Sequence, residues 1–319
     1  MTKYLFYNAQ VITPLSIKPG QVLVEDGIIK QVDLNPPSEG RPFQPSEVSP
    51  EPNLDKLAPE DRESIELIDC KGLYLSPGFI ESHVHGGGGY DFMDGDIDSI
   101  EGACLAHLAH GTTSIVPTTI TSTRESMMDT LRLVNEVEVD KPGHRWILCL
   151  HLVGPYFSPL QAGAQDPKYL RDPNPDEYQE ALALTDRIIR WSFAVELPGS
   201  ELFLKTLREH HIATSVAHSN ASYQEVEAAY ENGVTCLTHF YSAMSTVTRR
   251  NAFRVGGVVE AGYLIDDLYV EAITDGCHLP PELLRLIYKV KGSDRIILVT
   301  DAMRGAGMPD GTVTKLGNI

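Results

Sequence analysis

The chain has few cysteines for its length, and they form no recognisable motif. Five are scattered over 319 residues without any CxxC pair: Cys70, Cys104, Cys149, Cys236 and Cys277. An odd, scattered set argues against a disulfide framework and against a zinc site made of thiolates. We therefore expect reduced thiols and a cytoplasmic protein.

The sequence also lacks long apolar runs and is poor in basic residues. No apolar run approaches the roughly 18 residues of a membrane span, and residues 1–10 show no signal sequence. Forty-four acidic residues against 26 basic ones give a formal net charge of −18. A field of that sign repels nucleic-acid phosphates and anionic lipids, so we expect neither partner. An anionic substrate would need local arginine or histidine.

Residues 1–75 predict a small β-domain. Short apolar runs alternate with turns over residues 4–33, and Glu25-Asp26-Gly27 separates two of them as a hairpin turn would. Residues 35–63 are rich in proline and glutamate, which predicts an exposed loop or a disordered insertion. Strand character returns over 65–75. The expected structure is a partial β-sandwich with an insertion at about 35–63.

From residue 76 onward, short apolar runs alternate with amphipathic stretches. Eight expected strands cover 78–82, 114–117, 146–151, 190–194, 213–217, 235–239, 269–273 and 295–300. Expected helices cover 100–110, 124–137, 175–189, 202–210, 223–232 and 281–291. Eight strand-then-helix units predict an α/β fold, a (β/α)8 barrel of the TIM type over residues 76–319.

A doubly wound open sheet is the alternative fold, and it requires a glycine-rich phosphate loop after its first strand. Four consecutive glycines at 86–89 do follow the first expected strand. They do not form a GxGxxG pattern, and no helix opens directly after them. The barrel explains this segment better, because the flanking histidines need a reason of their own.

Polar side chains recur where the expected strands end, which in a barrel is one common face. They are His83, His85, His151, His218, His239, Asp275, His278 and Asp301. His83 and His85 lie two residues apart in an extended segment, so both imidazoles point to the same face. With imidazoles from strands five and six and the carboxylate of Asp301, they form a donor set typical of hydrolytic metal sites.

Longer motifs resemble a known family. They are PGFIESHVHG at 77–86, HLVGPYF at 151–157, GAQ at 163–165, AHSNA at 217–221, THFYSAM at 238–244, TDGCH at 274–278 and LVTDA at 298–302. Together they resemble the amidohydrolase superfamily and, within it, the N-acetylglucosamine-6-phosphate deacetylases, from about residue 4 to the end. The resemblance implies hydrolysis of N-acetylglucosamine 6-phosphate to glucosamine 6-phosphate and acetate, in amino-sugar catabolism.

The resemblance also implies roles for individual residues. A divalent metal would activate water, with zinc as the expected ion and iron, manganese or cobalt as alternatives. Its ligands would be His218 and His239, with His83 and His85 beside them. Asp301 would carry the proton from the water to the leaving amine. The family's sugar-phosphate contacts correspond to Ala164, Gln165, Ser242, Ala243, Arg250 and His278. Family members pair, so we expect a homodimer.

Two departures from the family pattern bear on activity. The family has glutamate, a direct metal ligand, where this chain has Val153, and valine cannot coordinate an ion. The sequence also ends at Ile319, whereas family members continue with a helix and with strands that complete the β-sandwich. Smaller changes are Ser242, usually asparagine, and Gln165, histidine in some members. We expect the fold to be kept, metal binding to be weakened and deacetylation to be much reduced.

Two other functions remain open. A catalytically dead homologue that binds a sugar phosphate would account for Val153, but it would have little need for Asp301 as a proton shuttle. An amidohydrolase of other specificity, such as a dihydroorotase-like enzyme or an N-acyl-amino-acid hydrolase, is disfavoured by the segment at 238–244. Metal content tests the first alternative, and a panel of acyl substrates tests the second.

Overall fold

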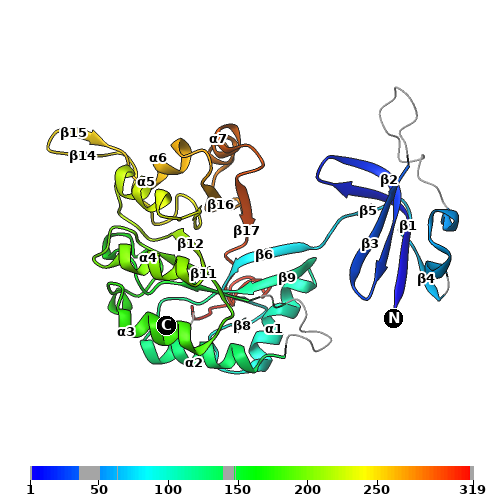
Figure 1. The fold of residues 1–319 in the computed structure, drawn as a ribbon, viewed down its shortest axis with the longest axis horizontal. Helices are drawn as coiled ribbons and strands as arrows, with labels where there is room; N and C mark the ends of the chain where they lie inside the picture. The colour runs from blue at the N-terminus through cyan, green and yellow to red at the C-terminus, as the bar shows by residue number, and fades with distance from the viewer. Residues whose placement is uncertain (1, 36–50, 63, 139–146, 148, 317–319) are drawn as a thin grey trace. The chain divides into compact units, whose positions relative to one another are not determined.

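The structure is a computed structural model, and it describes residues 2–35, 51–62, 64–138, 147 and 149–316. The chain divides into two compact units, Met1–Gly78 and Phe79–Ile319. Figure 1 shows the first unit as a set of strands and the second as strands surrounded by helices. Each unit is described on its own below.

The first unit is a single five-stranded sheet. Its strands are β1 (Lys3–Thr13), β2 (Ser16–Glu25), β3 (Ile28–Leu34), β4 (Ile65–Asp69) and β5 (Tyr74–Leu75). The order is β3-β2-β1-β4, with β5 also beside β1. The predicted hairpin turn joins β2 to β3, and Asp26 and Gly27 both adopt the positive φ that a tight two-residue turn needs.

The expectation of an exposed loop over residues 35–63 is wrong for the later part of that segment. Two short 3-10 helices, η2 (Leu54–Lys56) and η3 (Pro59–Asp61), pack there. Leu57 is 3% exposed and contacts Leu5 and Leu23 of the sheet. Proline does not prevent this, because it is well tolerated in the first turn of a helix. Residues 36–50 and 63 lie outside the described residues.

Among the described residues, eight parallel strands form the barrel of the second unit. They are β6 (Phe79–Val84), β9 (Thr112–Pro117), β10 (Leu150–Val153), β11 (Ile188–Phe193), β12 (Ala213–Val216), β13 (Cys236–Leu237), β16 (Tyr269–Ile273) and β17 (Ile296–Val299). Strands β10 to β17 pair in that order, and β6 pairs with β9. A parallel bridge between Thr118 and His151 joins the ends of β9 and β10. The backbone N–H of Asp301 donates to His83 O at 3.0 Å and joins the end of β17 to β6.

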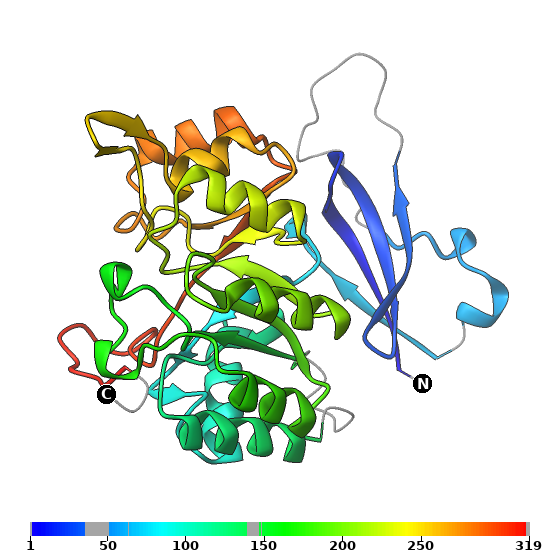
Figure 2. The ribbon, with the colours of Figure 1, turned by 60° about the vertical axis from the view of Figure 1, so that its left-hand side comes forward.

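The predicted barrel is therefore confirmed, and Figure 2 shows helices outside its strands. The helices are α1 (Ile97–Leu108), α2 (Arg124–Glu136), α3 (Pro175–Leu184), α4 (Ser200–Glu209), α5 (Tyr223–Glu231), α6 (Val258–Leu264) and α7 (Pro281–Lys291). Side chains at helix starts accept backbone N–H groups; Asp96 caps α1, and Ser222 with Glu225 forms a capping box on α5. Among the described residues, no helix is long and apolar enough to cross a membrane.

Two helix predictions need correction. The helix expected over 175–189 ends at Leu184, because Ile188 and Ile189 belong to β11 and pair beside β10. The sequence pattern did not separate the helix from the strand, because both contain apolar residues, and the two were therefore predicted as one helix. Helix α6 was not predicted because it has only seven residues.

Short elements lie within the loops that connect the strands and helices of the barrel. They are β7 (Gly86–Gly87), β8 (Tyr90–Asp91), η4 (Pro159–Gln161), η5 (Pro167–Tyr169), and the hairpin strands β14 (Thr248–Arg250) and β15 (Phe253–Val255). The main apolar core lies between the sheet and the helices, and its largest buried side chains include Trp191, Tyr156 and Phe203. Trp191 also donates from its indole N–H to Gly154 O at 2.8 Å, which ties the end of β10 to β11.

Candidate metal centre and active site

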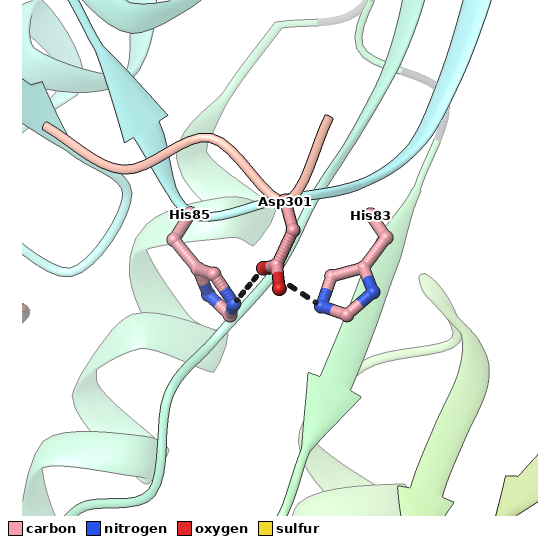
Figure 3. Close-up of side chains that lie close together, drawn as sticks. All are labelled: His83, His85 and Asp301. Carbon is pink, nitrogen blue, oxygen red and sulfur yellow. Dashed lines mark ion pairs between the residues drawn. The ribbon is translucent and has the colours of Figure 1, made fainter. Parts of the chain in front are cut away.

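Three side chains from opposite ends of the barrel sequence meet at the carboxyl ends of β6 and β17. His83 lies on β6, His85 follows that strand, and Asp301 follows β17. Figure 3 shows the carboxylate between the two imidazole rings. Oδ1 of Asp301 lies 3.0 Å from Nε2 of His85 and 3.4 Å from Nε2 of His83. One ligand atom from each residue lies within 4.8 Å of the others, close enough to share one ion.

The donor set fits a divalent metal ion. Nε2 of His83 is buried and has no hydrogen-bond partner, an arrangement that is costly unless another group occupies the position. Two imidazoles and one carboxylate are ligands that suit zinc and related divalent ions. Among the described residues, this is the one cluster of three or more histidine, cysteine or acidic side chains placed to share an ion.

A second histidine pair lies beside this cluster. His218 follows β12 and His239 follows β13, and their Nε2 atoms are 3.2 Å apart. The rings of His83 and His239 lie 5.6 Å apart between centroids, so the two groups are neighbours. Both backbones are left-handed, with φ of 44° and 37°. Such strained conformations cost of the order of 1–3 kcal/mol and cluster at functional sites.

Burial sets the charge of these groups. It lowers the pKa of His218 to about 3 and that of His239 to about 4, so both are neutral at pH 7. Although burial acts to raise it, the pKa of Asp301 is held well below its usual range by His83 and His85. For His83, burial acts to lower the pKa, but the carboxylates of Asp301 and Glu271 raise it overall. The site thus combines the neutral imidazoles of His218 and His239 with the ionised carboxylate of Asp301.

Val153 stands at the end of β10, and its surroundings are apolar. It is 1% exposed and packs with Phe157, Ala217 and Leu170. Phe157 also lies against the ring of His218, with centroids 4.5 Å apart. The apolar packing around Val153 therefore reaches the ring of His218 through Phe157.

The sugar-phosphate residues expected from sequence occupy several places. Gly163 lies against His218 and Ala243, since a Cβ placed on it would be 3.2 and 3.3 Å from their side chains. Ala164 is exposed, whereas Gln165 is buried and its Oε1 accepts the backbone N–H of Thr121 at 3.0 Å. The loops carrying Ala243 and residues 163–165 thus meet beside His218.

Ser242 is tied to the histidine pair, since its backbone N–H donates to His239 O at 2.9 Å. Arg250 is exposed on β14 and lines a cavity of about 180 Å³ together with Arg249, Ser222 and Thr246. His278 is half exposed, and its Nδ1 pairs with Asp275 at 2.8 Å. Within the described residues, the structure gives no contact between Arg250 or His278 and the histidine cluster.

Sequence reasoning missed a buried ion pair inside the barrel. Glu271 on β16 is 0% exposed and pairs with both Arg190 on β11 and Nδ1 of His83. The signal for them is a single charge inside an apolar strand, as in YVEAI and IIRWSF. His151 was noted at a strand end but given no role; its Nε2 lies 2.6 Å from Ser192 Oγ.

The sequence profile of the amidohydrolase family matches residues 74–306. The chain belongs to the amidohydrolase family. It is 31% identical over 250 residues to the N-acetylglucosamine-6-phosphate deacetylase of Lysinibacillus sphaericus, covering 78% of this chain and 64% of that protein. It is 32% identical over 245 residues to the N-acetylgalactosamine-6-phosphate deacetylase of Escherichia coli O157:H7, covering 76% and 63%.

A solved structure is similar over nearly the whole chain. The N-acetylglucosamine-6-phosphate deacetylase from Pasteurella multocida superposes with a TM-score of 0.83 at 29% identity, covering 99% of this chain and 76% of that one. The matches to the two curated relatives span less than two thirds of their lengths.

Proposed function

We propose that this amidohydrolase removes the N-acetyl group of N-acetyl-D-glucosamine 6-phosphate, giving D-glucosamine 6-phosphate and acetate. The supporting observation is the His83, His85 and Asp301 cluster at the carboxyl end of a barrel whose relatives are named sugar-phosphate deacetylases. The galactosamine epimer is the second substrate to test, because a similarly related protein is named for it.

We propose that the ion in this chain is held by His83, His85 and Asp301, with zinc as the first candidate. Supporting this are the partnerless Nε2 of His83 and the valine beside the other histidine pair. When bound, a divalent ion there supplies a Lewis acid for the amide carbonyl and a more acidic water.

The chain's own residues supply the rest of the chemistry. The carboxylate of Asp301 stays ionised at neutral pH, so it can accept a proton from the attacking water and pass it to the departing amine. His218 and His239 are neutral, and Nδ1 of His218 donates to Gln161 O at 2.9 Å, so its Nε2 accepts the hydrogen bond from Nε2 of His239. The Nε2–H of His239 can turn to donate to the acetamide oxygen. Arg250 provides local positive charge for the phosphate and His278 an imidazole for hydrogen bonding, with Ala164, Gln165, Ser242 and Ala243 lining the sugar. We propose a cytoplasmic homodimer.

A sugar-phosphate-binding protein without catalysis is the second candidate, and the apolar packing of Val153 favours it.

The decisive experiment measures acetate release from N-acetylglucosamine 6-phosphate with added Zn²⁺, using the unaltered chain, Val153→Glu and Val153→Gln. Glutamine matches glutamate in size and polarity but lacks its charge, so it controls for the disturbed packing. We expect slow turnover by the unaltered chain and a gain of at least tenfold in Val153→Glu alone.

Other outcomes are equally informative. Fast turnover by the unaltered chain would show that a third ligand at residue 153 is not needed. No turnover by any variant, with the sugar phosphate still bound, would establish the binding protein. An equal gain in Val153→Gln would contradict the role of residue 153 as a ligand position.

A further inference from the structure

The interior of the barrel holds a fully buried carboxylate, that of Glu271. Its Oε2 lies 2.9 Å from Nδ1 of His83 and accepts the backbone N–H of His239 at 3.1 Å. Its Oε1 accepts a hydrogen bond from Nη1 of Arg190. One carboxylate thus contacts both histidine groups of the site, although it lies on a different strand from either.

Arg190 fixes this carboxylate from the other side. Its Nε donates to Ser215 Oγ at 3.0 Å, and its Nη2 donates to Thr238 Oγ1 at 3.1 Å. Ser192 Oγ lies 2.7 and 2.9 Å from these two hydroxyl oxygens, which closes a buried polar network. A buried ion pair adds little net stability compared with apolar packing, so its presence calls for a reason in geometry.

The carboxylate decides which nitrogen of His83 carries the proton. An ionised carboxylate only accepts hydrogen bonds, so Nδ1 of His83 must donate to Glu271. When the ring is neutral, the lone pair of Nε2 then points away from Glu271 toward Asp301, 3.4 Å distant. That is the tautomer in which Nε2 can bind a metal ion, and a carboxylate on the far nitrogen is the usual device for selecting it.

We propose that Glu271, held by Arg190, is a positioning residue that locks His83 in the Nδ1–H tautomer and directs its Nε2 to the ion. This inference rests on the proposed metal centre, because the orientation of His83 serves to bind the ion there. Glu271 acts through His83 and does not touch the substrate.

The test is Glu271→Gln, assayed by Co²⁺ titration and by ¹⁵N NMR of the histidine rings in the metal-free protein. Arg190 is charged and offers only donors, so the amide oxygen of glutamine should face it. The amide NH₂ should then face Nδ1 of His83, and the hydrogen bond from the backbone N–H of His239 is lost. His83 should then switch to the Nε2–H tautomer. We expect Co²⁺ affinity to fall about 10- to 100-fold, the usual effect of losing such a partner.

Two further variants separate positioning from general stability. Glu177→Gln breaks another buried ion pair, with Arg171, that involves no histidine; it should leave Co²⁺ affinity within threefold. In Arg190→Met/Glu271→Gln the amide oxygen is free to face His83, so the Nδ1–H tautomer and the affinity should return. This double variant also carries no unpaired buried charge, so it tests the idea if Glu271→Gln does not fold.

The outcomes distinguish this proposal from the proposed function. A Glu271→Gln protein with unchanged tautomer and unchanged Co²⁺ affinity would overturn the positioning role, as would a double variant that recovers neither. If the unaltered chain binds no Co²⁺, the metal centre fails. The tautomers of His83 in the metal-free proteins still decide the role of Glu271 in that case.

Discussion

The His83 side and the His218 side of the active site differ in what surrounds their imidazoles. His83 lies between two carboxylates, those of Asp301 and Glu271. His218 instead lies against the ring of Phe157, which packs with Val153. Each side leaves one buried imidazole nitrogen without a hydrogen-bond partner, Nε2 of His83 and Nδ1 of His239, but only the second side pairs its two imidazoles with each other. The ionised carboxylates lie on the His83 side, where we propose that the ion is held.

Removal of the shared carboxylate should have the largest effect on the first side. We expect Asp301→Asn to lower kcat/KM by about 10³-fold, because it removes the proposed base, and to lower metal content as well. Asp267→Asn, at an exposed aspartate paired with Arg295, is the matched control and should retain activity. Acetate release and metal analysis of the purified proteins measure both effects. Near-normal turnover by Asp301→Asn would mean that another group moves the proton.

Single histidine substitutions should show the asymmetry between the two sides directly. We expect His85→Ala to weaken Co²⁺ binding more than 100-fold, because it deletes one of three ligands. His218→Ala should weaken it less than 10-fold, since His218 is not in the cluster of three ligands that the described residues place to share an ion. Titration monitored by the visible Co²⁺ spectrum measures both. The reverse order would place the ion between His218 and His239.

The pH dependence of stability should differ between the two sides in the metal-free protein. A buried histidine with a lowered pKa disfavours folding only where the unfolded chain is protonated and the folded chain is not. For His239, with a pKa near 4, the free energy of unfolding is unaffected above about pH 6.5, where the ring is neutral in both states. It decreases as the pH falls toward 4, because the unfolded chain binds a proton that the folded chain does not. The raised pKa of His83 gives the opposite slope.

Thermal unfolding of His239→Gln and His83→Gln between pH 4 and 8 measures this difference. His239→Gln should flatten the loss of stability below pH 6.5, by up to about 3 kcal/mol at pH 4. His83→Gln should change the profile only above about pH 6.5, where it removes the loss of stability that accompanies deprotonation of His83 in the folded protein. Equal pH profiles for the two variants would contradict the assigned pKa directions.

Local sequence determined most of the barrel. Apolar runs separated by amphipathic stretches gave the eight strands, and helix α7 was predicted with both ends correct, over 281–291. Periodicity could not separate α3 from β11, because both are apolar, and it could not reveal the seven-residue α6. In the first unit, Leu57 and Asp61 pack on the sheet although their surroundings in sequence read as a loop.

For the site, sequence by itself supplied the chemical groups. The HxH pair, the histidines after two later strands and Asp301 are readable because barrel strands end on one face. Only the tertiary structure decided which of these groups form ion pairs and hydrogen bonds with one another. The partners of His83 are 188 and 218 residues away in sequence, and Arg190 reaches Glu271 across 81 residues. Closure of the barrel brings these groups within hydrogen-bond distance, and no local pattern records a contact made through the centre of a ring.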